Sequence, residues 1–238
     1  MASDSPVPVL ALIPGYQEAP RIGAVVEAAR RHLPVLVVDD GSSDATADVA
    51  EAAGAEVIRQ RPNQGKGAAL RVGFRHALDA DAAAVVTLDA DGQHDPDEIP
   101  AFLAAWGARR APLVIGRRAF WEMPPARRLA NELGTRTFSW AVGRHIPDNQ
   151  SGYRLVGSPL MRLLLDSAER GFEFEVEMIT LAIRAGMVID WVPIRTIYAG
   201  EPSHIRPIHH VVGFLRVARS ARRTVRQPLG PPPTDRDA

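Results

Sequence analysis

Two carboxylates, Asp89 and Asp91, directly follow an apolar segment of the chain at residues 83–88. Where a chain leaves a buried strand, carboxylates one residue apart can converge on one hard cation such as Mg²⁺ or Mn²⁺. Such a cation usually completes its shell with water and with the phosphates of a substrate. The pattern Asp-x-Asp is common by chance, but its place at the end of a predicted strand favours a site for a metal and a diphosphate.

Two other polar segments each have a functional and a structural interpretation. Residues 39–42, Asp-Asp-Gly-Ser, follow the apolar residues 35–38: they are either part of an acidic edge of the sheet that needs a cation or hydrogen-bond donors, or an ordinary turn. Residues 63–67, Asn-Gln-Gly-Lys-Gly, open a predicted helix whose free N–H groups could bind phosphate, the alternative being a tight turn packed against the sheet. They lack the P-loop spacing GxxxxGK(S/T), and the turn after the first strand lacks GxGxxG, so ordinary dinucleotide binding is not expected.

These residues need a scaffold that brings the ends of several strands together. Short β-branched apolar segments alternate with alanine-rich helical ones as far as residue 116. This alternation is typical of an α/β protein with a doubly wound, mostly parallel sheet and helices on both faces, in which ligands bind beyond the carboxyl ends of the strands. The predicted strands are residues 7–13, 35–38, 56–59, 83–88 and 113–115. The predicted helices are residues 20–32, a segment ending at residue 53, 66–78 and 97–106.

The second part of the chain has a less regular pattern. We expect helices over residues 126–142, 160–166 and 175–185, a strand over 188–198 and a last helix over 208–226. Residues 227–238 are rich in proline and are expected to form a disordered tail. The length of 238 residues allows one large α/β domain, which we assign to residues 1–226.

Composition narrows the class of protein. The chain has no cysteine, which excludes disulfides, zinc–thiolate sites and a thiol nucleophile and is compatible with a reducing cytoplasm. No apolar stretch approaches the roughly 20 residues of a membrane-spanning helix. The net charge is zero, but residues 1–100 carry 16 Asp/Glu against 8 Lys/Arg, and residues 101–238 carry 12 against 20. The first part is thus suited to holding a cation and the second to meeting an anion.

Short motifs along the chain resemble those of the family 2 glycosyltransferases of the GT-A fold. The likeness is greatest to the branch that loads sugars onto polyprenyl phosphates, the dolichyl-phosphate mannose synthase-like enzymes, and it spans roughly residues 7–207 in the family's order. The motifs are IPGYQE at residues 13–18, VVDDGSSD at 37–44, NQGKG at 63–67, LDADGQH at 88–94 and DNQSGYR at 148–154, continued by FEFE at 172–175 and VPI at 192–194.

The resemblance implies a Rossmann-like nucleotide-sugar-binding half at residues 7–116. The residues that it places around the donor are Pro14, Tyr16, Glu18, Val38, Asp40 (near the base), Asp89, Ala90 and Asp91. Asp89 and Asp91 would bind Mg²⁺ or Mn²⁺, and Gln93 is similar to a third ligand of this branch. Gln17 stands where the family usually has asparagine.

The resemblance also implies an acceptor-binding half at residues 117–207. Arg117 and Arg118 fall where the family has a phosphate-binding arginine, and Arg118 is the better match. Where eukaryotic-type members have an arginine and a lysine after the VPI strand, this chain has Tyr198 and His204. The acceptor phosphate would then be bound by Arg195, His204 or Arg206.

The expected activity is inverting transfer of a sugar from a GDP- or UDP-sugar to a polyprenyl phosphate, with Asp89, Asp91, Arg118 and Asp148 as the catalytic residues. A phosphate oxygen is already anionic near neutral pH and needs no general base. A hydroxyl acceptor on a glycan or small molecule would need one, for which Asp148 is the candidate. A third interpretation is a non-catalytic nucleotide-sugar-binding protein, against which the intact pair of aspartates argues. The sugar and the oligomeric state are left open.

Basic helical segments suggest contact with a membrane surface. Arg216, Arg219, Arg223 and Arg226 fall along one side of the predicted helix 208–226, which could lie on anionic lipid or simply present a solvated face. Residues 126–142, with Arg127, Arg128, Phe138 and Trp140, are a second candidate that matches the region where this branch meets the bilayer. The basic residues lack interleaved aromatics and the pI is about 7.1, so nucleic acid is not an expected partner. We therefore expect a cytoplasmic protein, peripheral on the cytoplasmic face of the membrane.

Overall fold

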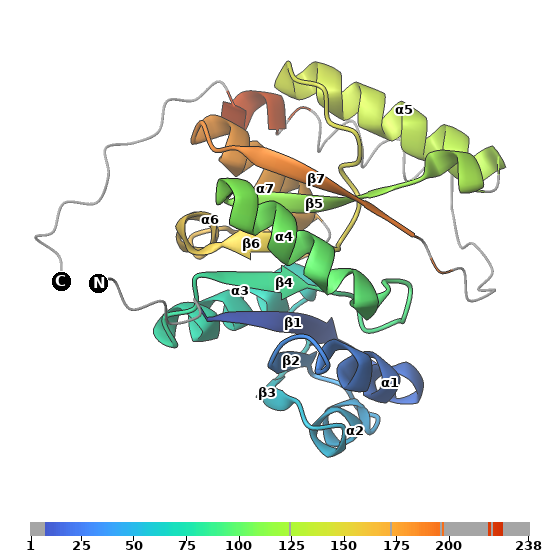
Figure 1. Cartoon of the computed structure of the whole chain (residues 1–238), viewed down its shortest axis with the longest axis vertical. Coiled ribbons are helices and arrows are strands. Elements are labelled where there is room, and N and C mark those ends of the chain that lie inside the picture. The colour runs from blue at the N-terminus through green and yellow to red at the C-terminus, as the bar shows by residue number, and fades with distance from the viewer. Residues whose placement is uncertain are drawn as a thin grey trace, which may run out of the picture.

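A seven-stranded sheet forms the centre of the protein (Figure 1), in a computed structural model that describes residues 8–123, 125–171, 173–195, 197, 219 and 221–225. The strands lie in the order β3-β2-β1-β4-β6-β5-β7. Their bounds are β1 (Val9–Gly15), β2 (Val35–Asp40), β3 (Glu56–Gln60), β4 (Ala84–Thr87), β5 (Leu113–Arg118), β6 (Arg154–Gly157) and β7 (Ile189–Ile194).

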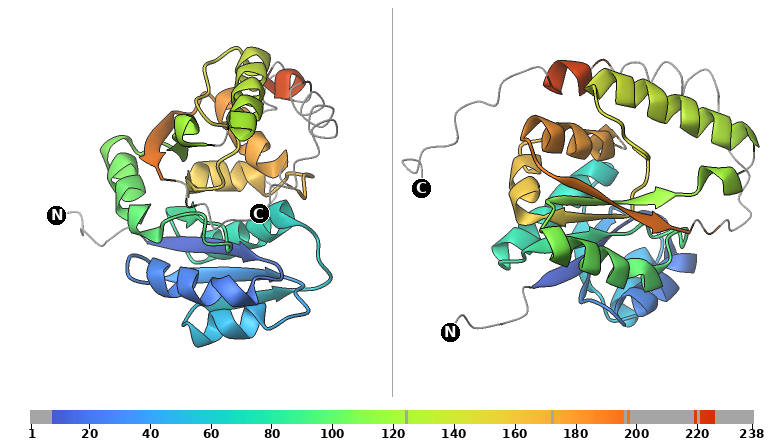
Figure 2. Two further views of the ribbon diagram at one scale, coloured as in Figure 1. Left: turned by 90° about the vertical axis from the view of Figure 1, so that its right-hand side faces the viewer. Right: turned by 45° about the horizontal axis from the view of Figure 1, so that its top comes forward.

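Helices cover both faces of this sheet (Figure 2). They are α1 (Ala19–Ala29), α2 (Thr46–Ala52), α3 (Lys66–Asp79), α4 (Ile99–Arg109), α5 (Pro125–Val142), α6 (Ser158–Leu164) and α7 (Glu173–Arg184), with single 3-10 turns at Pro96–Glu98 and Phe120–Glu122. Successive residues of β1 point to opposite faces, and each face has its own apolar core. Leu12 packs with Phe74 of α3 and Met178 of α7, whereas Ile13 packs with Ile22 of α1 and Phe102 of α4.

The expected α/β class with a mostly parallel sheet is confirmed, with one strand that we did not predict. β1 pairs in parallel with β2 and β4, β2 with β3, and β5 with β7, but β6 runs antiparallel between β4 and β5. Arg154, the first residue of β6, lies opposite Thr87 of β4 and Ile115 of β5. Because β6 runs in the opposite direction, the loop that precedes it reaches the edge of the sheet where β4 ends.

Several predicted boundaries are corrected by strand pairing. Asp39 and Asp40 do not form a turn after β2 but belong to it, since Asp39 pairs in register with Gly15 and Arg59 and Asp40 with Gln60. Other strands also shift: β1 covers Val9–Gly15 instead of 7–13, β5 extends to Arg118, and β7 ends at Ile194 instead of 198.

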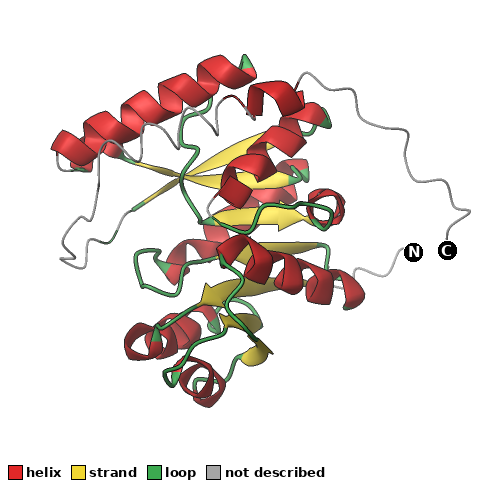
Figure 3. Ribbon diagram, turned by 180° about the vertical axis from the view of Figure 1, so that it is seen from behind, coloured by secondary structure: helices red, strands yellow, loops and turns green. Residues whose placement is uncertain are grey.

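The long helix α5 crosses one end of the molecule, which Figure 3 shows from behind. Residues 219 and 221–225 are helical and lie beside it, with Ala221 buried and the Arg222 guanidinium 4.5 Å from the centre of the Trp140 ring. The remainder of the predicted helix 208–226, including Arg216 and Arg226, and the predicted tail lie outside the described residues. The assignment of residues 1–226 to one domain stays a prediction.

Candidate active site

Asp89 and Asp91 lie just beyond β4, at the edge of the sheet where the parallel strands end. Their neighbours Leu88 and Ala90 are buried, so the carboxylates alternate with the residues that anchor this loop in the core. Gly92 has a φ of +77°, a left-handed conformation that glycine adopts readily and that turns the chain sharply after Asp91. The backbone N–H of Gln93 then donates to Asp91 Oδ1 at 2.9 Å. The buried residues of the loop and its own hydrogen bond thus hold it in place.

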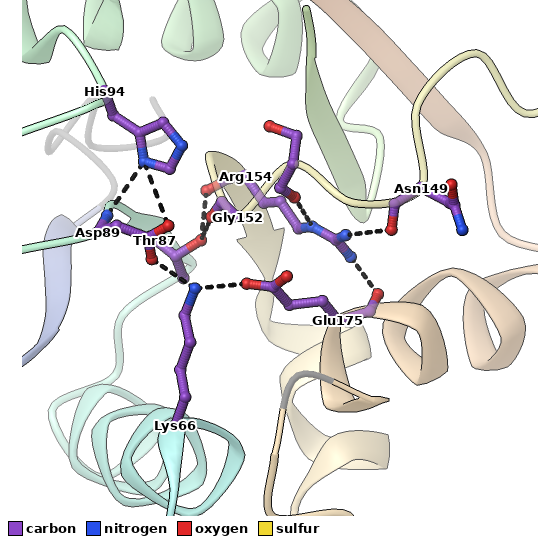
Figure 4. A network of polar contacts seen from close by, with 9 residues as sticks. Lys66, Thr87, Asp89, His94, Asn149, Gly152, Arg154 and Glu175 are labelled. Carbon is purple, nitrogen blue, oxygen red and sulfur yellow. Dashed lines mark hydrogen bonds and ion pairs between the residues drawn. The ribbon is translucent and has the colours of Figure 1, made fainter. Parts of the chain in front are cut away.

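Lys66 reaches the same place from α3, where it is the first helical residue. Its Nζ lies 2.5 Å from Asp89 Oδ1 and 2.7 Å from Glu175 Oε1 of α7, as Figure 4 shows. Gly65, just before the helix, has a φ of +95°, and a Cβ there would lie only 2.4 Å from the backbone oxygen of Arg170. Only a glycine fits this turn, and the turn places the Lys66 side chain between Asp89 and Glu175.

These charges set one another's ionisation. Burial raises the pKa of Asp89, but the nearby charges of Lys66 and His94 outweigh it and lower that pKa to about 2. Burial lowers the pKa of Lys66, but Asp89 and Glu175 outweigh it and raise that pKa above its ordinary value. At neutral pH, therefore, Asp89 is a carboxylate and Lys66 an ammonium.

His94 supports the Asp89 backbone. Its Nδ1 accepts the N–H of Asp89 at 3.1 Å, and its ring lies 5.0 Å from that of Tyr153. Because the imidazole is buried, its pKa is lowered, which favours a neutral ring with the proton on Nε2. Its contact with the Asp89 backbone thus helps to hold the loop that carries the two aspartates.

The loop before β6 closes the site from the other half of the chain. Thr87 Oγ1 donates to the backbone oxygen of Gly152 at 2.8 Å. A Cβ on Gly152 would lie 2.8 Å from Glu175 Oε1 and 3.0 Å from both Asp89 Oδ2 and Lys66 Nζ. The absence of a side chain at this position lets β4, α3 and α7 meet.

Arg154 holds the same loop in place through buried hydrogen bonds. Its guanidinium is fully buried and donates to the backbone oxygens of Ser151, at 2.7 Å, and Glu175. Arg154, Lys66 and Glu175 are not among the site residues that we predicted, although all three lie in the quoted motifs.

The expected nucleotide side lies at the ends of β1 and β2. The Asp40 carboxylate is buried and accepts the side-chain amide of Gln60 (2.7 Å) and the backbone N–H groups of Gln64 (2.8 Å) and Gly65 (2.7 Å). It therefore holds the turn that presents Lys66, a function that we did not predict.

The other predicted donor residues differ in exposure. Tyr16 is half-exposed, and Glu18 forms an ion pair with Arg21 at 2.7 Å. Pro14 lies opposite Val38 in the sheet, and the Val38 side chain is fully buried in the core. Their contact with a nucleotide stays a prediction.

On the acceptor side, Arg118 and Asp148 bind each other. Arg118 Nε lies 2.8 Å from Asp148 Oδ2, and Nη2 lies 3.0 Å from Oδ1, which also accepts the N–H of Gln150 at 3.0 Å. Asp148 is fully buried, whereas Arg117 is exposed.

Of the three further candidates for binding the acceptor phosphate, Arg195 alone lies within the described residues. The Arg195 guanidinium lies 2.7 Å from Asp95 Oδ2, and the backbone N–H of Arg195 donates to Glu98 Oε1. His204 and Arg206 lie outside the described residues.

The residues after β4 fit a hard divalent cation. Asp89, Asp91 and Gln93 offer carboxylate and amide oxygens, the donor types that Mg²⁺ and Mn²⁺ prefer. Among the described residues, no group of three or more His, Asp or Glu side chains forms a closed metal cage. An ion here would need oxygens from water or a substrate, as is usual for Mg²⁺.

The outer face of α5 carries a row of exposed apolar side chains. Leu129, Leu133 and Trp140 fall along one side of the helix, with the exposed Arg136 between them. Phe138, which we grouped with Trp140 as a membrane candidate, is instead fully buried, because it lies on the opposite side of the helix. In the described part of the chain, no helix is both long and apolar enough to cross a bilayer.

Comparison with known proteins gives consistent similarities. The family model described as "Glycosyl transferase family 2" matches residues 11–157. The undecaprenyl-phosphate mannosyltransferase of Micrococcus luteus is 34% identical over 204 residues (78% of this chain, 82% of that protein). The polyprenol monophosphomannose synthase of Mycolicibacterium smegmatis is 31% identical over 204 residues (78% and 76%). Glucosyl-3-phosphoglycerate synthase of Mycobacterium tuberculosis, crystallised with Mn²⁺, UDP-glucose and phosphoglyceric acid, shares the fold, with a TM-score of 0.70, 19% identity and coverage of 91% and 80%.

Proposed function

The chain belongs to glycosyl transferase family 2 and is a glycosyltransferase, and on this premise we propose that it moves a sugar from a nucleoside diphosphate sugar to a polyprenyl phosphate. The observation that carries this proposal is the state of Asp148. A general base must reach the proton that it removes, whereas Asp148 is fully buried and both its oxygens accept from Arg118. A phosphate acceptor needs no base, so this arrangement suits it better than a hydroxyl.

Asp89, Asp91 and Gln93 are the residues that would hold a divalent cation against the donor diphosphate. When bound, such a cation offsets the negative charge that develops on the leaving nucleoside diphosphate. His94 holds the Asp89 backbone in place, Lys66 keeps the Asp89 carboxylate ionised, and the Gln93 N–H holds the Asp91 carboxylate in place. The Mn²⁺ and UDP-glucose in the structural neighbour support this assignment.

The reaction is a single in-line displacement. An oxygen of the acceptor phosphate forms a bond to the anomeric carbon while the bond from that carbon to the donor diphosphate breaks, which inverts the anomeric centre. Arg118, held by Asp148, and the exposed Arg117 supply positive charge where β5 ends. His204 and Arg206 are proposed to complete the phosphate site. Either a GDP- or a UDP-sugar satisfies this chemistry.

The exposed apolar row on α5 supports delivery of the acceptor from a membrane. Leu129, Leu133 and Trp140 face outward, whereas Thr135 on the inner side donates to Asn149, next to Asp148, at 3.2 Å. The helix thus links the acceptor loop to the outer surface. We place this row and the basic residues 208–226 against the cytoplasmic face of the bilayer.

Product analysis with two matched lipids tests the proposal. The purified chain is incubated with radiolabelled GDP- and UDP-sugars and Mn²⁺, with either undecaprenyl phosphate or undecaprenol in detergent. We expect a labelled lipid only from the phosphate. Transfer to undecaprenol or to a glycan hydroxyl, with no product from the phosphate, would establish the hydroxyl-acceptor reaction instead.

A further inference from the structure

Lys66 forms an ion pair with Asp89, one of the two aspartates of the proposed metal site, and we propose that it is an internal counter-cation that sets the affinity of that site. In this proposal Lys66 neutralises Asp89 before metal binds, and Glu175 retains the ammonium when Asp89 turns to the metal. Lys66 is therefore a positioning residue, and the inference rests on the proposed metal site of Asp89 and Asp91.

The first support is the choice of residue. Of the 28 lysine and arginine residues in the chain, Lys66 is the single lysine. Arginine has a wide planar guanidinium, whereas lysine ends in a compact charge with three donors that can be shared among partners. The ammonium has two carboxylates within 2.7 Å, and its side chain is 17% exposed. This narrow space suits lysine in a chain that uses arginine everywhere else.

The second support is the competition at Asp89. An ammonium 2.5 Å from Asp89 Oδ1 takes part of the negative charge that a metal would use. Two cations next to one carboxylate also repel each other, and this repulsion is strong where water is largely excluded. Lys66 must therefore weaken metal binding at Asp89 unless another anion holds it back.

Glu175 is that anion, and it is rigidly placed. Its side chain is 8% exposed, its backbone oxygen accepts from the buried Arg154, and Gly152 packs against its carboxylate. Asp89 is more open, with a side chain that is 29% exposed. The fixed acid can keep the ammonium while the more accessible acid exchanges it for a metal.

The proposal predicts opposite effects for two isosteric substitutions. Lys66→Met removes the competing charge and should lower the Kd for Mn²⁺ about tenfold. Glu175→Gln removes the acid that holds Lys66 back from Asp89 and should raise that Kd about tenfold. Arg75→Met is the matched control, because Arg75 is an exposed cation on the same helix and should leave the Kd unchanged. Mn²⁺ titration calorimetry without donor or acceptor measures these values independently of turnover.

The single lysine gives a second measurement that needs no substitution. In protein labelled with ¹³C-lysine, one side-chain Cε signal reports the surroundings of Lys66. We expect this signal to shift on Mg²⁺ titration, and the midpoint of the shift should equal the midpoint of Mg²⁺ binding to the same protein.

The outcomes separate this inference from the proposed function. A lower Kd for Lys66→Met, a higher Kd for Glu175→Gln and a shifted lysine signal support the inference. If Lys66→Met does not fold, the higher Kd of Glu175→Gln and the shifted signal together support it. If the parent binds Mn²⁺ but both variants bind equally well or equally poorly, Lys66 has no such role while the metal site stands. If neither the parent nor Lys66→Met binds Mn²⁺, the metal site itself is wrong and the inference falls with it.

Discussion

Arg118 and Asp148 form a bidentate ion pair in which each carboxylate oxygen accepts a different guanidinium N–H, at 2.8 and 3.0 Å. The pair joins the end of β5 to the loop before β6, two segments 30 residues apart. Because this geometry matches the planar fork of arginine, Asp148 fixes the direction in which the guanidinium points. In this arrangement Asp148 is a positioning residue for Arg118.

A double-mutant cycle on this pair tests that relationship. Asp148→Asn and Arg118→Gln should each lower kcat/KM for the polyprenyl phosphate by about 10–100-fold, with little change in the Kd of the nucleotide. Because the two residues act as a unit, the double variant should be no worse than the poorer single variant. Additive losses, with the fall for Asp148→Asn mostly in kcat, would show that Asp148 acts alone as a base.

Removal of Asp91 tests the metal site. Asp91→Ala should lower the transfer rate by at least about 10²-fold, because the charge on the departing diphosphate loses its stabilisation. Circular dichroism should show an intact fold, since Asp91 contacts the Gln93 N–H and is not part of the core. The control is Asp97→Ala, an exposed aspartate shortly after it that pairs with Arg31. Equal rates for Asp91→Ala and the parent would remove Asp91 from the mechanism.

We expect Glu98 to make the stability of the protein depend on pH. Burial raises the pKa of its carboxyl group, and its Oε2 has no hydrogen-bond partner among the described residues. A folded-state pKa above the unfolded value means that the protonated form favours folding, so this contribution is lost as pH rises through the folded pKa. Glu98→Gln, which is neutral at every pH, should therefore gain stability relative to the parent between pH 4 and pH 8. Urea unfolding at both values measures it, and a constant difference between the two proteins would contradict the prediction.

The two faces of α5 should respond differently to substitution. Leu133→Glu and Trp140→Glu should reduce binding to vesicles that contain phosphatidylglycerol while leaving the unfolding midpoint nearly unchanged, because both side chains are exposed. Val188→Glu, exposed but not on α5, is the control. Phe138→Ala should instead lower the free energy of unfolding by about 3–5 kcal/mol, because it empties a core position. Vesicle flotation that is the same for all the glutamate variants would show that α5 does not bind lipid.

Local patterns in the sequence predicted the parallel strands, the helices and the position of Asp89 and Asp91. They could not predict β6, because four residues after a polar loop carry no periodic signal, and its pairing with β4 spans more than 60 residues. The boundary of β2 was placed too early because aspartates are rare in strands, and only pairing with β1 and β3 satisfies them there.

The role of Lys66 was also beyond local patterns. Its partner Glu175 is 109 residues away, and only the packing of α3 against α7 brings them together. The side of α5 that Phe138 occupies, by contrast, follows from helical spacing: it is buried, whereas Trp140 lies two residues further round the helix and is exposed.

Gly152 limits how this enzyme can diversify. Exchanging a single hydrogen there for a methyl group would crowd an ammonium and two carboxylates from separate parts of the chain at once. This meeting point of three segments of the chain is thus closed to variation, and a new substrate preference has to arise from substitutions at the rim of the site. A directed-evolution library for altered specificity should leave this meeting point untouched.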